Sequence, residues 1–130
     1  MEITLRPATL GDAAYIGHHL RASDLHEMQC LTDLPPAEIV VSSRGYSNWC
    51  RVFEIDGLPA VIFGVTPSSR PTWGIPWLLA TEAAMPHARR LVRQCHGQVS
   101  EMQATYPNLH NQVHRDNLTS IEWLQWLGFT

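Results

Sequence analysis

The residues of this chain that could do chemistry are seven histidines, three cysteines and a few scattered carboxylates. His110 and His114 lie four residues apart, but we place them on or beside a strand, where that spacing gives no shared ligand face. The stretch "HEMQC", residues 26–30, combines three metal-ligating residue types, yet no second cluster accompanies it. Ligand spacing therefore predicts no metal site. Neither a P-loop nor a Gly-x-Ser-x-Gly pattern is present.

Proton transfer is the chemistry that these side chains leave open. Glu54, Asp56 and His114 could each serve as a general base, as could ordered water, and spacing singles out none of them. Cys95 falls on the apolar stripe of an expected helix, so we interpret it as a core residue rather than a nucleophile.

Length and composition limit the class of protein. The 130 residues suit one domain, residues 1–130, and 45% of them are apolar, enough for a hydrophobic core. A formal charge of −3 gives no electrostatic reason to bind nucleic acid. No apolar run reaches the ~20 residues of a membrane span, and the N-terminus lacks signal-peptide features. Three widely spaced cysteines favour a reducing compartment over a disulfide framework.

The first half of the chain predicts a strand, helical segments and a hairpin. Residues 2–9 alternate apolar and polar side chains and read as a short strand. Thr9 and Asp12 fit a capping box at the start of a helix. Further helical segments are expected near residues 25–30 and from Pro36 onward. Asp56-Gly57, between two apolar runs, is a strong hairpin signal.

The second half predicts a strand, a long helix, a strand and a last helix. Residues 73–79 form the strand, in which Pro76 removes one ladder donor and calls for an edge, a bulge or an unpaired flank. Apolar residues from Ala84 to Tyr106 recur at the helical period. A short strand over 109–113 and a helix over 117–127 follow. The order is β-α-α-β-β-β-α-β-α, an α/β fold of mixed α+β type with helices on both faces of one mixed sheet. Its strands 73–79 and 109–113 are expected to be parallel.

Three stretches of this sequence resemble the GNAT N-acetyltransferase superfamily. They are "ITLRPATLGDAAYI", "FEIDGLPAVIFGVTP" and "HNQVHRDNLTSIEWLQWLGF", and the likeness extends from the first of them to the last, over almost the whole chain. In the last of them, Asn117 opens a helix that ends in Gly128-Phe129. The resemblance implies a GNAT-like fold, and it implies that the strands which usually follow Gly-Phe are lacking here.

The resemblance also implies a site for acetyl-CoA. Backbone groups of the strand before the long helix, at Trp77, Leu78 and Leu79, would pair with the pantetheine arm like an added strand. The turn into the long helix would hold the pyrophosphate. Here that turn, "ATEAAMPHARR", has no glycine, and Arg89 and Arg90 are the residues that could reach a phosphate. Asn117 completes the expected cofactor-binding set.

Catalytic residues follow less directly from the resemblance. Many family members place a tyrosine seven residues after the motif asparagine to protonate the leaving thiolate, and here that position is Leu124. His114, just beyond the last strand, is the best-placed base on the family's topology. Glu54 is the second candidate.

A narrower resemblance concerns "GVTPSS", "WGIPWLLATE" and the ending "WLQWLGF", which look like small GNAT-like phage proteins that include the internal virion protein A family. It implies a virion-associated or assembly protein, made in the host cytoplasm and incorporated in the virion. A protein partner or a second copy would bind the C-terminal helix and an open sheet edge. Two functions stay open: such an assembly protein with a degenerate acetyl-CoA site, and an acetyl-CoA-dependent N-acetyltransferase.

Overall fold

The computed structural model describes residues 2–110 and residue 125. Its elements, in chain order, are β1 (Ile3–Pro7), α1 (Leu10–His18), α2 (Ala22–Leu31), α3 (Pro36–Tyr46), β2 (Trp49–Ile55), β3 (Leu58–Pro67), β4 (Trp73–Ala80), the 3₁₀ helix η1 (Glu82–His87), α4 (Ala88–Thr105) and β5 (Asn108–Leu109). No helix of the described part has the length and apolar character needed to cross a bilayer.

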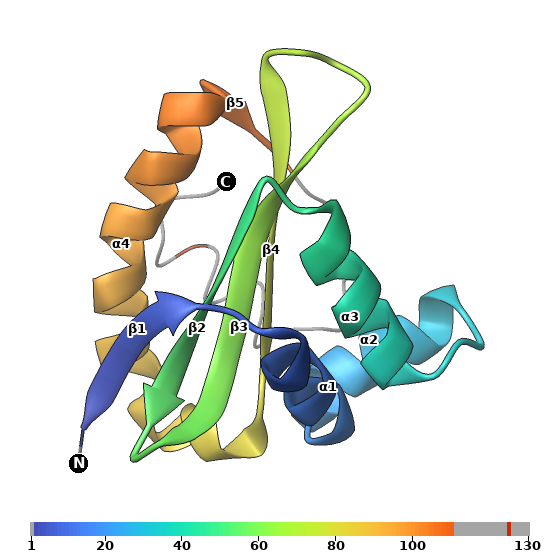
Figure 1. The fold of residues 1–130 in the computed structure, drawn as a ribbon, viewed down its shortest axis with the longest axis vertical. Helices are drawn as coiled ribbons and strands as arrows, with labels where there is room; N and C mark the ends of the chain where they lie inside the picture. The colour runs from blue at the N-terminus through green and yellow to red at the C-terminus, as the bar shows by residue number, and fades with distance from the viewer. Residues whose placement is uncertain (1, 111–124, 126–130) are drawn as a thin grey trace.

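The described strands form one mixed sheet in the order β1-β2-β3-β4-β5 (Figure 1). The first four strands are antiparallel neighbours, and β4 and β5 are parallel. Parallel neighbours require a crossover, which η1 and α4 supply. The βαβ unit expected around the long helix is therefore confirmed.

Helices cover both faces of the sheet, as expected (Figure 1). On one face the apolar side of α4, including Leu91 and Cys95, packs against Phe53 and Phe63. On the other face α1 and α3 contribute Ile16 and Val40, which pack with Ile62 of β3. Because β3 is buried on both faces, its apolar run is nearly continuous rather than alternating.

Two local predictions are confirmed. The Thr9 hydroxyl accepts a hydrogen bond from the Asp12 backbone N–H, and the Asp12 carboxylate accepts one from the Thr9 N–H, which completes a capping box. At the hairpin, Asp56 and Gly57 both have positive φ, 51° and 85°. That pair of angles matches the right-handed twist of the flanking strands.

Two predictions need correction. Three helices precede β2 instead of two, because the segment expected near residues 25–30 is a ten-residue helix, α2. The long helix begins at Ala88 rather than at Ala84, and residues 82–87 form the 3₁₀ helix η1. Pro86 lies inside η1, where its missing N–H would leave a gap in an α-helical ladder. The remainder of the last strand, the final helix and any later strands lie outside the described residues.

Helices α1 and α3 cross at very short range, and Gly17 permits it. A Cβ built at Gly17 would lie 2.4 Å from the Cα of Ala37, a backbone atom that no rotamer change can move. Gly97, in the middle of α4, has no atom within 4 Å of the same construction. These two helical glycines therefore have opposite roles.

We expect Gly17→Ala to lower the free energy of unfolding by about 1–3 kcal/mol, because the helices must separate. The matched variant Gly97→Ala should raise it by about 0.5–1 kcal/mol through helix propensity. Urea unfolding followed by circular dichroism measures both. Equal shifts of the two variants would contradict the proposed close crossing.

Candidate functional site

The site centres on β4, beside its parallel neighbour β5. Trp73 pairs with Asn108 and Gly74 with Leu109, and the His110 N–H donates to the Gly74 carbonyl at 3.0 Å. The ring of Tyr106 lies against Gly74, so close that a Cβ there would be 2.4 Å from the ring. This contact lies where Trp73 and Gly74 of β4 pair with β5, a place that we call the neck.

Beyond the neck, the alternation of backbone hydrogen bonds decides which residues of β4 face away from β3. The β3–β4 register is unbroken from Pro67↔Gly74 to Val61↔Ala80. Gly74 and Ala80 both bond to partners outside β3. Since an antiparallel strand alternates residue by residue, Pro76 and Leu78 must also direct their backbone groups to that outer side.

Pro76 belongs to this outward set, which explains why a proline is tolerated inside the strand. Its missing N–H would have pointed away from β3, so the β3–β4 ladder loses no bond. At Leu78 both the N–H and the carbonyl face outward, and no described residue pairs with them there. Leu78 is thus a residue of β4 whose donor and acceptor both face this outer side.

The end of β4 is closed by the start of α2. The Arg21 N–H donates to the Ala80 carbonyl at 2.8 Å, and the Asp24 carboxylate accepts from the Ala80 N–H at 3.0 Å. Arg21 and Asp24 also form an ion pair of 2.7 Å, with each side chain only 2% exposed. This buried clamp occupies the outward groups of Ala80.

The turn after β4 leads into η1 and α4. Glu82 turns its carboxylate toward α2 and accepts a hydrogen bond from the Ala22 N–H at 2.7 Å. Its negative charge therefore lies at the N-terminus of α2, where the positive end of the helix dipole stabilises it. Arg89 and Arg90, in the first turn of α4, are exposed.

The structure does not place the other predicted site residues at the outward edge of β4. Trp77 and Leu79 direct their backbone groups to β3 and their side chains to the core cluster beneath α1 and α3. Trp77 donates from its indole N–H to the Ser47 hydroxyl at 2.7 Å. His114 and Asn117 lie outside the described residues, so their roles stay predictions.

Glu54 lies on β2, two strands away from β4, in an ion cluster at the start of α1. Its carboxylate pairs with the Arg6 guanidinium, which also forms two hydrogen bonds, of 2.6 and 2.8 Å, with Asp12. The pKa of the Asp12 carboxyl is held below its usual range, chiefly by the hydrogen bonds from Arg6. The cluster joins β1, β2 and α1, which is a structural task.

The thiols in the two cores are poor nucleophiles. Burial raises the pKa of Cys50 and of Cys95 to about 12 in each case. A thiol with so high a pKa carries almost no thiolate near neutral pH. Within the described part of the chain, no group of three His, Cys, Asp or Glu residues could hold a metal ion.

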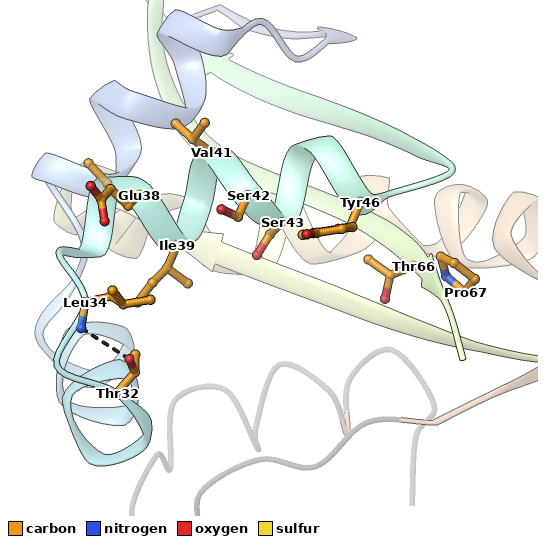
Figure 2. Close-up of a pocket in the computed structure, with 11 residues that line it drawn as sticks. Thr32, Leu34, Glu38, Ile39, Val41, Ser42, Ser43, Tyr46, Thr66 and Pro67 are labelled. Atoms are coloured by element: carbon orange, nitrogen blue, oxygen red, sulfur yellow. Dashed lines mark hydrogen bonds between the residues drawn. The ribbon is translucent and has the colours of Figure 1, made fainter. Parts of the chain in front are cut away.

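Sequence reasoning did not find an open hollow of about 890 Å³ beside α3 (Figure 2). We call it the α3 trough and define it by the lining residues Leu34, Glu38, Ser42, Tyr46, Thr66 and Pro67. Its walls come from the α2–α3 connection, from α3 and from the end of β3. No local pattern in the sequence indicated it, because the hollow arises where these separate segments meet.

No protein-family model matches the chain. No curated protein matches it in sequence. Among solved structures, a GNAT-family acetyltransferase of Streptococcus pneumoniae superposes with a TM-score of 0.62 at 18% identity, over 99% of this chain and 85% of that one. Ard1 of Thermoplasma volcanium gives 0.67 at 15% identity, over 100% and 84%. YncA of Salmonella typhimurium, an acetyltransferase solved with acetyl-CoA, gives 0.61 at 16% identity, over 98% and 79%.

The chain therefore has the fold of the GNAT acetyltransferases. At such low identity the likeness establishes the fold alone, and it gives no support to the narrower resemblance to phage virion proteins. Acetyl-CoA is the cofactor that this fold implies. The residues present fit it at Leu78, whose outward N–H and carbonyl can pair with a pantetheine amide, and at the exposed Arg89 and Arg90.

The Asp12 cluster makes stability depend on pH. Because Arg6 lowers the pKa of folded Asp12, the stabilisation is fully present above the unfolded value near 3.9 and is lost as pH falls through the folded value. Asp12→Asn should cost about 1–2 kcal/mol at pH 7, and its difference from wild type should narrow below about pH 4. Urea titrations over this range measure it, with exposed Asp33→Asn as control. A difference independent of pH would refute the assignment.

The clamp at the end of β4 gives a second expectation. Asp24→Ala removes the carboxylate that pairs with the buried Arg21 guanidinium and should cost about 3–5 kcal/mol. If the variant still folds, amide exchange at Ala80 should accelerate far more than at Phe63 in the neighbouring strand. NMR-detected exchange measures both amides. Unchanged protection of Ala80 would show that Asp24 does not close the strand.

Proposed function

We propose that this protein is an acetyl-CoA-dependent N-acetyltransferase that acts on a primary amine. The observation that carries the proposal is the outward backbone pair of Leu78 on β4, beside the neck between two parallel strands, in a GNAT fold. An extended ligand can add to such an edge through main-chain hydrogen bonds. Similarity to acetyltransferases, one of them solved with acetyl-CoA, supports the same reading.

The cofactor would supply an acetyl group activated as a thioester. The chain's own contribution begins with binding: Leu78 would orient the pantetheine arm, while Arg89 and Arg90 would offer positive charge to the phosphates. The clamp at Ala80 would confine the pairing to Leu78, since Ala80's own groups are already bonded. Such fixed positioning is a large part of what an acyl transfer between two bound reactants needs.

The amine must be neutral when it attacks the thioester carbonyl, so one proton leaves the nitrogen and the thiolate takes one as it departs. Glu54 lies two strands away from β4, and its carboxylate is ion-paired with Arg6. It is therefore badly placed to act as the base. His114 and ordered water remain the predicted proton acceptors, and Asn117 a predicted cofactor contact.

The virion-assembly role, with its protein partner at the C-terminal helix and its localisation in host and virion, rests on the phage resemblance, on the turn without glycine and on Leu124 in place of the family's tyrosine. No contact of the described residues favours it over catalysis. We therefore keep it as the alternative that a lack of cofactor binding would revive.

Isothermal titration calorimetry with acetyl-CoA tests the proposed function directly. We expect saturable binding in the micromolar range and transfer of acetyl groups to amines. No binding at millimolar cofactor would end the proposal. Replacing Arg89 and Arg90 together with alanine should weaken binding and reduce its salt dependence, because phosphate charges lose their partners.

A pair of proline variants tests the assignment of Leu78. Leu78→Pro removes an N–H that faces the cofactor edge and should weaken acetyl-CoA binding about tenfold while the sheet persists, which corresponds to one lost hydrogen bond. Leu79→Pro removes an N–H bonded to β3 and should unfold the domain. Circular dichroism separates folding from binding. Wild-type affinity in a folded Leu78→Pro variant would refute the pairing.

A further inference from the structure

The α3 trough leads to the neck of the proposed cofactor site. Thr66 and Pro67, at one end of the trough, pair with Ile75 and Gly74 of β4. Gly74 lies in the neck, where it pairs with Leu109 of β5. A molecule lying in the trough would thus have one end beside β4, the strand that carries Leu78.

Polar groups follow one line along the trough. Glu38, Ser42 and Tyr46 are spaced four residues apart on α3, so they share one side of the helix. Figure 2 shows them with Thr66 and Pro67 at the far end from Leu34. From Glu38 to Tyr46 is eight residues, which is about 12 Å along a helix.

Among the described residues that line the trough, Glu38 is the charged one. None of these lining residues forms a hydrogen bond or an ion pair with the Glu38 side chain. The rest of that lining is largely apolar, with Leu34 59% exposed and Ile39 and Pro67 beside it. A single carboxylate at one end of an apolar trough complements a cation carried on an aliphatic chain.

We propose that the α3 trough binds the acceptor, and that the acceptor is an elongated aliphatic diamine or polyamine. This inference rests on the proposed N-acetyltransferase function and names its substrate class. One nitrogen, still protonated, pairs with Glu38. The methylene chain lies along Ile39 and Tyr46, and the other nitrogen, about 12 Å away by the helical spacing, reaches the hydroxyls near Thr66 and attacks the thioester. The products are the N-acetyl amine and the free thiol.

Matched amines and a matched pair of variants test the inference. Wild type should acetylate 1,8-diaminooctane with a lower KM than octylamine, which lacks the second charge. Glu38→Gln should raise the KM for the diamine roughly twofold to fivefold, the value of one exposed ion pair, without changing the KM for octylamine or the affinity for acetyl-CoA. Asp33→Asn removes a nearby exposed carboxylate that is not among the trough's described lining and should change neither amine's KM.

The outcomes separate the two proposals. Turnover of both amines with no effect of Glu38→Gln overturns the trough assignment and leaves the acetyltransferase intact. If acetyl-CoA does not bind, an NMR titration of the chain with 1,8-diaminooctane still tests whether the trough binds the diamine. Chemical-shift changes along α3 that Glu38→Gln abolishes would support binding there. The absence of such changes would refute it. A dimer in sedimentation that Tyr46→Ala dissociates would make the trough an interface between copies and would also refute the diamine.

Discussion

The alternation of backbone hydrogen bonds along β4 is the constraint on which the rest of this site depends. Because β3 takes the groups of Ile75, Trp77 and Leu79, the groups of the intervening residues must find partners on the other side. The Gly74 carbonyl accepts from the His110 N–H just after β5, and the groups of Ala80 bond to Arg21 and Asp24 at the start of α2, whereas no described residue pairs with those of Leu78. A shift of one residue in register would exchange the two sets, so that the groups of Leu78 would bond to β3 instead of facing outward.

The clamp from α2 and the conformation of the turn after β4 belong together. A turn without glycine cannot approach a phosphate through a bare, flexible backbone, and here the chain instead forms a 3₁₀ helix with Pro86 inside it. Glu82 and Thr81 fasten this turn, the one to the N-terminus of α2 and the other to the Ala60 carbonyl. The start of α4 is thereby held by neighbouring elements rather than by its own loop, which leaves Arg89 and Arg90 as the available cations.

Much of the fold follows from local patterns in the sequence, whereas much of the site does not. The capping box at Thr9, the Asp56-Gly57 hairpin and the helical stripe on α4 each have a physical cause within a few residues of chain. Pro76 likewise indicated that its strand lacks one backbone donor, which here falls on the side away from β3. By contrast, Arg21 and Asp24 read as an ordinary pair at the start of a helix, and only the docking of α2 on β4 buries them. The α3 trough likewise arises where α3 and the end of β3 meet, which no local pattern encodes.

The Trp77 side chain links the two halves of the proposed site. Its indole donates to Ser47 at the end of α3, and Gly64 makes room for it, since a Cβ there would lie 3.1 Å from the indole nitrogen and 2.7 Å from the Trp49 carbonyl. The wall of the trough is therefore fastened to the same strand whose opposite edge presents Leu78. An amine on α3 and an acetyl group on β4 would then be held by one rigid body, and their approach would not depend on the closure of a loop. In a protein whose described residues single out no base near β4, such fixed proximity is the contribution to catalysis that the fold itself can make.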